Sequence, residues 1–330
     1  MPLPQQFHRL RLPVIGAPMF IVSGLDLVEA QCRAGILGTF PALNARPQSE
    51  FAVWLEQLGE RLAGTHSLYG VNLICHASND RLSGDLETCM KFKVPLIITS
   101  LRPPAEVVQG AHAYGGLVFH DVTTVRHAEK AAEQGVDGLI VVCAGAGGHG
   151  GATSPFALLP EIRRFFPGTL ILAGAIGDGA AILAAQAMGA DLVYMGTRFI
   201  ATREANAAPG YKQMIVDSGS KDVTYTNMFS GVHGNYLSKS MIAAGLDPAN
   251  LPAPETGRTY VAGHKREKPK AWSEIWGAGQ GAGAITDTPP VATLIQRMEA
   301  EYRAAADRLA TLAGAPSRIG IQVPDLGAGM

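Results

Sequence analysis

The sequence has few cysteines, and their arrangement does not suit a cysteine-based site. Cys32, Cys75, Cys89 and Cys143 are the four cysteines among 330 residues, with no CxxC pair and no spacing typical of metal ligands. Neither sign of charge is in excess, since 27 basic residues stand against 28 acidic ones and no dense Lys/Arg run is present. These absences argue against a metal centre and against a nucleic-acid partner.

Long hydrophobic runs are also missing. No stretch of about 18 uninterrupted apolar residues occurs, which argues against a membrane-spanning helix. The first residues, MPLPQQFHRLRLP, lack the apolar centre of a signal peptide. Because 47% of the residues are hydrophobic and 17% are charged, the chain can bury a large core. We therefore expect a reduced, cytoplasmic protein without membrane contact, built as one large domain with or without a subdomain.

Short apolar runs alternate with segments of helical period as far as about residue 200, which is typical of βα units. Eight such runs fit a (β/α)₈ TIM barrel better than a doubly wound sheet. The latter is expected to have a glycine-rich turn after its first strand, where this chain has PMFIVSG. The predicted strands are 13–17, 35–40, 68–73, 95–99, 116–120, 138–143, 169–173 and 191–195. Predicted helices include 47–58, 105–113, 125–134, 156–165 and 179–188.

The alternation ends near residue 218, where Gly, Pro and Asn become frequent. We therefore expect residues 1–218 to form the barrel and residues 219–289 to form a smaller, loop-rich cap subdomain. Residues 290–330 should add a C-terminal helix and tail. Apolar Val291, Leu294, Ile295 and Met298 share one face of that helix and predict that it docks on the barrel. The tail from 315 to 330 is expected to be poorly ordered or to pack as an extended strap.

Catalytic groups of such barrels follow the carboxyl ends of the strands. Two of these loops, 174–179 and 196–198, are small and each opens a helical segment. Backbone N–H groups at such positions bind phosphate. The sequence therefore predicts a phosphorylated cofactor or substrate at Gly174, Gly196 and Thr197, although these glycines could instead only form tight turns.

His149 stands in the run CAGAGGHGG, directly after the sixth predicted strand. Its imidazole could take a proton from a carbon acid or donate a hydrogen bond to a developing anion. A purely structural histidine is the alternative. His120 ends the fifth strand and could contact a cofactor or cap a neighbouring carbonyl. Neither GxSxG nor HExxH occurs, so no serine-hydrolase or zinc-protease motif competes with this reading.

Four motifs carry a resemblance to a known family. They are GVNL at 70–73, AGAGGHGG at 144–151, MGTRF at 195–199 and WGAGQGAG at 276–283. Together they resemble the nitronate monooxygenase family, formerly called 2-nitropropane dioxygenases, over residues 10–310. The resemblance implies an FMN-dependent barrel that oxidises alkyl nitronates or nitroalkanes with O₂ to carbonyl compounds and nitrite.

The resemblance also implies roles for particular residues. His149 corresponds to the active-site histidine of the family, and Met19 to a methionine that faces the flavin. Gln280 is expected to line the site. The remaining predicted cofactor-binding residues are Asn72, Ser100, His120, Gly148, Gly174, Gly196 and Thr197.

Other functions remain open at the level of sequence. An NAD(P)H-dependent flavin reductase of quinones or enoyl thioesters could use the same scaffold, because a fold does not determine its chemistry. A phosphosugar isomerase or lyase and a flavin-storage protein are further alternatives. The sequence also leaves open whether NAD(P)H is a donor and whether the chain forms a homodimer.

Overall fold

The computed structural model describes residues 3–65, 67–102, 104–251 and 272–314, and these form a closed barrel of parallel strands. The order around the barrel is β1-β9-β8-β6-β5-β4-β3-β2, and the Gly16 N–H donates to the Leu37 carbonyl (2.8 Å) where β1 meets β2. The predicted (β/α)₈ fold and its eight strands are confirmed. The strands are β1 (Val14–Gly16), β2 (Gly38–Pro41), β3 (Tyr69–Cys75), β4 (Leu96–Leu101), β5 (Leu117–Val122), β6 (Gly138–Val142), β8 (Thr169–Ala173) and β9 (Leu192–Met195).

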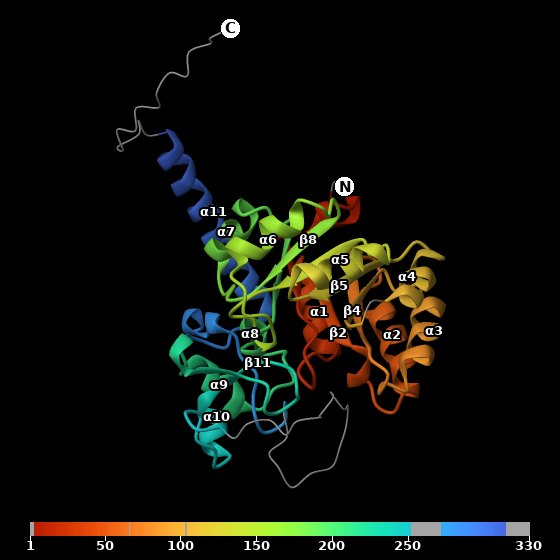
Figure 1. The fold of residues 1–330 in the computed structure, drawn as a ribbon. Helices are drawn as coiled ribbons and strands as arrows, with labels where there is room; N and C mark the ends of the chain where they lie inside the picture. Colours follow the sequence, from red (N-terminus) through yellow and green to blue (C-terminus); the bar gives the residue numbers. More distant parts are fainter. Residues whose placement is uncertain (1–2, 66, 103, 252–271, 315–330) are drawn as a thin grey trace.

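Helices separate the strands along the chain and surround the barrel (Figure 1). The barrel helices are α1 (Leu25–Arg33), α2 (Ser49–Arg61), α3 (Leu82–Lys91), α4 (Ala105–His112), α5 (Val125–Glu133), α6 (Pro155–Arg163), α7 (Gly179–Ala187) and α8 (Thr197–Ile200). Later helices are α9 (Pro209–Val216), α10 (Ser238–Ala243) and α11 (Val291–Gly314), and short 3₁₀ turns are η1 (Gln5–Arg9), η2 (Ala42–Asn44), η3 (Ser220–Asp222) and η4 (Gln280–Ala284).

Alternate residues of each strand point into the barrel or out toward the helices, as the period of two requires. Inward side chains such as Ile98, Phe119 and Ile140 form one buried cluster. Their neighbours in sequence, such as Val118 and Leu139, pack in a second cluster with the helices. Phe7 of η1 belongs to the inner cluster, with its ring centroid 5.7 Å from that of Phe119. The inner rows therefore fix which residues reach the mouth of the barrel.

A small antiparallel sheet covers the mouth. It contains β7 (Gly148–His149), β10 (Val223–Thr226) and β11 (Gly234–Leu237), in the order β10-β11-β7. The glycine-rich loop after β6 is therefore partly a strand. The described part of the predicted cap, 219–289, supplies β10, β11, α10 and η4, while 252–271 lie outside the described residues. The domain boundaries at 218 and 289 remain predictions.

Helix α11 packs against α7 and α1. Its residues Val291, Leu294, Ile295 and Met298 are all buried. Farther along, α11 extends away from the barrel (Figure 1), and residues 315–330 lie outside the described residues. Within the described ranges, no helix combines the length and apolar character needed to cross a membrane.

The contact between α7 and α11 depends on Gly179. A Cβ added there would overlap the Met298 carbonyl and the Tyr302 nitrogen, and would lie 2.8 Å from the Glu301 Cβ. The Gly179 N–H also donates to Glu301 Oε2 (2.9 Å). The helices therefore approach closely only because this position lacks a side chain.

We expect Gly179→Ala to lower the free energy of unfolding by about 1–3 kcal/mol, because overpacking forces the helices apart. Gly59→Ala is the matched control, since Gly59 is a helical glycine with nothing within 4 Å of an added Cβ. That control should be neutral or up to about 1 kcal/mol more stable. Urea denaturation measures both variants, and equal stability of the two would contradict the prediction.

Candidate active site

A cavity of about 770 Å³ lies at the carboxyl ends of the strands, between the barrel and the small sheet. Residues from β3, β4, β5, β6, β8 and β9 line it together with the segment 17–22 after β1 and the loop 145–153. The structure brings most of the predicted site residues to this cavity and leaves out His120 and Gln280. Those that line it are Met19, Asn72, Ser100, Gly148, His149, Gly174, Gly196 and Thr197.

His120 faces the wrong way for a cavity residue. Phe119 belongs to the inner cluster, so His120 points outward and Asp121 points inward. The His120 side chain is 3% exposed, and its Nδ1 lies 2.8 Å from Thr99 Oγ1. Burial lowers the pKa of His120 to about 4, so the imidazole is neutral at physiological pH. The structure therefore gives no support to a cofactor contact by His120.

Gln280 also lies off the cavity wall. Its side chain is exposed, while its backbone N–H donates to the Gly145 carbonyl (2.9 Å). The neighbours Gly279 and Gly281 do line the cavity. The glycines of the WGAGQGAG motif, rather than its glutamine, form this part of the wall.

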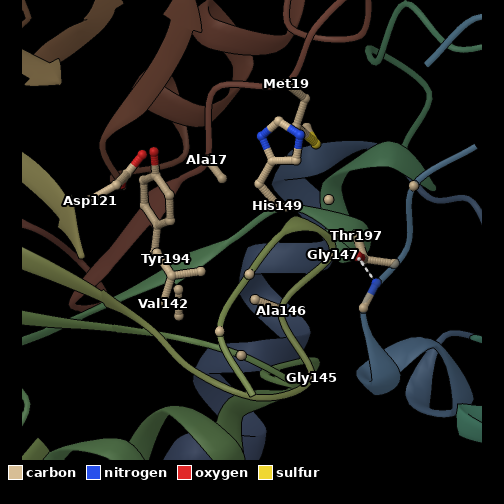
Figure 2. Close-up of a pocket in the computed structure, with 18 of the residues that line it drawn as sticks. Ala17, Met19, Asp121, Val142, Gly145, Ala146, Gly147, His149, Tyr194 and Thr197 are labelled. Carbon is tan, nitrogen blue, oxygen red and sulfur yellow. Dashed lines mark hydrogen bonds between the residues drawn. The ribbon is translucent and has the colours of Figure 1, made fainter. Parts of the chain in front are cut away.

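Two glycine-rich loops pack backbone against backbone at this point. A Cβ on Gly147 would lie 2.7 Å from the Gly279 nitrogen, and one on Gly279 would lie 2.6 Å from the Gly145 carbonyl oxygen. Thr197 Oγ1 accepts a hydrogen bond from the Gly279 N–H (2.9 Å), as Figure 2 shows. The missing side chains thus allow the loops after β6 and before η4 to build one wall.

The loops after β8 and β9 form a rim of the cavity. The hydrogen-bond donors of this rim are backbone N–H groups and not charged side chains. The backbone N–H groups of Ile176, Thr197 and Arg198 donate to no backbone carbonyl within the described ranges. A Cβ on Gly196 would first meet the Met19 sulfur, at 3.5 Å. The guanidinium of Arg198 is 3% exposed and donates to the carbonyl and the carboxylate of Asp287. This arrangement suits a small anion such as a phosphate group, bound by backbone dipoles.

His149 is held in place by the small sheet. It pairs with Gly234 of β11, and Asn235 Nδ2 donates to the Ala146 carbonyl (2.7 Å) in the same loop. The ring of Trp272 meets the imidazole edge-on, with centroids 5.4 Å apart. Figure 2 shows the imidazole extending toward Met19. The cap therefore fixes the orientation of the ring over the cavity.

The imidazole of His149 is neutral and is paired with a serine hydroxyl of the cap. Burial lowers its pKa to about 4. Its Nε2 lies 2.7 Å from Ser230 Oγ, whose hydroxyl also lies within bonding distance of the Val232 carbonyl (3.0 Å). Either atom of the His149–Ser230 pair can be the donor, according to which ring nitrogen carries the proton. In both tautomers the neutral ring keeps one unprotonated nitrogen.

Sequence reasoning missed three residues of this site. Asp121 and Tyr194 line the cavity, and Ser230 hydrogen-bonds His149. The first two could have been found by counting in steps of two from Phe119 and Leu192, whose side chains point into the barrel. Ser230 comes from the cap, 81 residues from His149. No local pattern in the sequence links these two.

A closed barrel with a cavity at the carboxyl ends of its strands is typical of barrel enzymes, whose active sites lie at that face. The nitronate monooxygenase family model matches residues 40–301, and the chain belongs to that family. Family membership indicates an oxidoreductase with a flavin cofactor.

Individual relatives agree with this assignment. The chain is 26% identical to a nitronate monooxygenase of Paraburkholderia phytofirmans over 90% of this chain and 94% of that protein. It is 29% identical to an octahydro-indene-carboxyl-CoA dehydrogenase of Mycobacterium tuberculosis over 70% of this chain and 64% of that protein. Thus the chain spans less than two thirds of the second relative.

Solved structures share the fold. FabK of Thermotoga maritima superposes with a TM-score of 0.75 at 22% identity, over 93% of this chain and 97% of that one. A nitroalkane oxidase of Streptomyces ansochromogenes gives a TM-score of 0.73 at 23% identity, over 92% and 99%. At these identities the likeness establishes the barrel and not the reaction.

The hydrogen bond from the Gly279 N–H to Thr197 predicts a difference between two substitutions. Thr197→Val removes the acceptor and should lower the free energy of unfolding by about 1–3 kcal/mol, the penalty for a buried donor left unpaired. Thr197→Ser keeps the hydroxyl and should lose less than about half of that. Urea denaturation measures both, and equal losses would show that the hydroxyl is unimportant.

Proposed function

We propose that the protein is an FMN-dependent nitronate monooxygenase that converts alkyl nitronates and O₂ to carbonyl compounds and nitrite. The observation that carries the proposal is the neutral imidazole of His149, fixed by the cap over a cavity with an uncharged anion-binding rim. Membership of the family supports the same reaction.

The cavity suits FMN in size and in its donors. About 770 Å³ lies within the usual range of pockets for small ligands and cofactors. The backbone groups at Ile176, Thr197 and Arg198 would hold the phosphate, next to Gly174 and Gly196. Met19 and Asn72 are the proposed contacts to the ring. When bound, FMN supplies the redox chemistry, because it can take electrons from the substrate and pass them to O₂.

The role of His149 depends on the protonation of the substrate. A neutral nitroalkane still carries a proton on its α-carbon, and a neutral imidazole can accept such a proton as a general base. A nitronate has already lost it, so His149 then needs only to orient the anionic nitro group. Because the imidazole is neutral and Trp272 packs against it, the cavity holds the anion without a fixed positive charge at this point.

We expect His149→Ala to lower kcat/KM for nitroethane by about 10²–10⁴-fold, the usual contribution of a general base. Turnover of ethyl nitronate should fall much less, by about 10-fold or below. Nitrite release measures both reactions. His8→Ala is the control, because His8 is an exposed residue of η1, outside the cavity. Equal losses with both substrates would contradict a base role.

A reductase is the second candidate, and the CoA dehydrogenase relative favours an acyl thioester as its substrate. The two reactions differ in what reduces the enzyme.

We expect the purified protein to be yellow and to release FMN rather than FAD on denaturation. Under anaerobic conditions, ethyl nitronate should bleach the flavin rapidly, and NADH or NADPH should not. Rapid bleaching by NAD(P)H alone would favour the reductase, and a protein that takes up no flavin would contradict both.

A further inference from the structure

Asp121 is an acidic residue in the cavity wall that the reaction described above does not use. It is the only carboxylic acid among the described residues that line the cavity. It stands two residues after Phe119 on β5, so its side chain rises directly from the inner core of the barrel. Asp121 therefore belongs to the floor of the cavity, whereas His149 stands in the loop after β6 that pairs with the cap.

The two oxygens of this carboxyl group have different surroundings. Ser100 Oγ donates to Asp121 Oδ2 (2.6 Å), and Asn72 Nδ2 donates to Ser100 Oγ (2.9 Å). A relay across the ends of β3, β4 and β5 thus holds Oδ2 as an acceptor. Oδ1 is shielded from solvent and has no hydrogen-bond partner within the described ranges. A buried polar atom without a hydrogen-bond partner is rare in native structures. It indicates that the atom binds a ligand or carries a proton.

Among the described residues, no positive charge contributes to the pKa of Asp121 and so stabilises it as an anion. Its neighbour in the wall is Tyr194, which burial keeps as a neutral phenol by raising its pKa (Figure 2). Arg198 lines the same cavity but is paired with Asp287. Burial raises the pKa of Asp121 to about 7, against the opposing effect of the Ser100 hydrogen bond. The other titratable residues of the wall are His127, His149, Tyr211, Tyr225 and His233.

We infer that Asp121 is a proton-carrying binding residue: its carboxyl group holds a proton on Oδ1 and donates it in a hydrogen bond to an acceptor on the bound cofactor ring. The acceptor is a carbonyl oxygen or an unprotonated ring nitrogen. A neutral carboxylic acid can donate a hydrogen bond to these groups, and a carboxylate cannot. A buried carboxylic acid that stays protonated in order to donate is a known solution in enzyme sites. The inference rests on the proposed function, because it takes the cavity to hold FMN.

The first experiment reads the proton directly and needs no flavin. Infrared difference spectra between the wild type and Asp121→Asn should show the carbonyl band of a protonated acid. That band should disappear as the pH rises through about 7, the pKa expected for the buried group. Because the Ser100 hydrogen bond favours the ionised form, Ser100→Ala should move the midpoint to higher pH. Absence of the band at pH 6 would overturn the inference.

The second experiment measures FMN affinity between pH 6 and 8.5. Wild-type affinity should fall as the pH rises through the pKa, because ionisation removes the donor. Asp121→Asn keeps a neutral donor and should bind within about 3-fold of the wild type at pH 6, with no such fall. Asp121→Leu has similar size without a donor and should bind at least about 10-fold more weakly, equivalent to one lost hydrogen bond. Titration of the FMN phosphate is common to all three proteins and cancels.

Several results would count against the inference. If Asp121→Asn bound FMN as weakly as Asp121→Leu, the group would act as an anion or acceptor. If both variants kept full FMN affinity and only KM for the nitronate rose, the acceptor would belong to the substrate and the assignment to the cofactor would be wrong. If the wild type took up no FMN, the proposed function would fail, whereas the infrared titration would still confirm or refute the proton on Asp121.

Discussion

The site depends on the backbone pairing of the cap with the glycine-rich loop of the barrel. Residues 148 and 149 form a ladder with β11, and the loop before η4 packs on Gly145 and Gly147 from the other side. Side chains at Gly147, Gly234 and Gly279 would overlap the neighbouring backbone and keep the segments apart. His149 is therefore positioned by tertiary pairing between segments about 85 residues apart in the sequence.

This constraint explains why the wall is rich in glycine. Some of these glycines allow two loops to pack closely, as at Gly147 and Gly279. Others leave space at the rim for a ligand, as at Gly196. The two uses cannot be separated from the sequence alone, because both require the absence of a Cβ. Only the positions of neighbouring atoms distinguish a glycine that faces another backbone from one that faces the cavity.

The barrel could be predicted from the sequence because its signal is local and repeated. Each strand is a short apolar run, and eight of them in order allow few topologies. The site was less predictable for two physical reasons. His120 was selected because it ends a strand, although the period of two places Asp121, and not His120, in the mouth. Ser230 reaches His149 only through the folding of the cap, and no residue spacing encodes that approach.

The protonation states of the titratable groups in the cavity are set more by burial than by ion pairs. The imidazole of His149 loses its charge on burial, and the carboxyl group of Asp121 gains a higher pKa for the same reason. Arg198 keeps its charge but is neutralised by Asp287. The rim formed by the described residues thus offers an anion dipoles and hydrogen bonds, whose strength depends on the position of the bound group. Such a site needs no rearrangement of charged side chains when a charge moves within it, since its dipoles are already oriented by the fold.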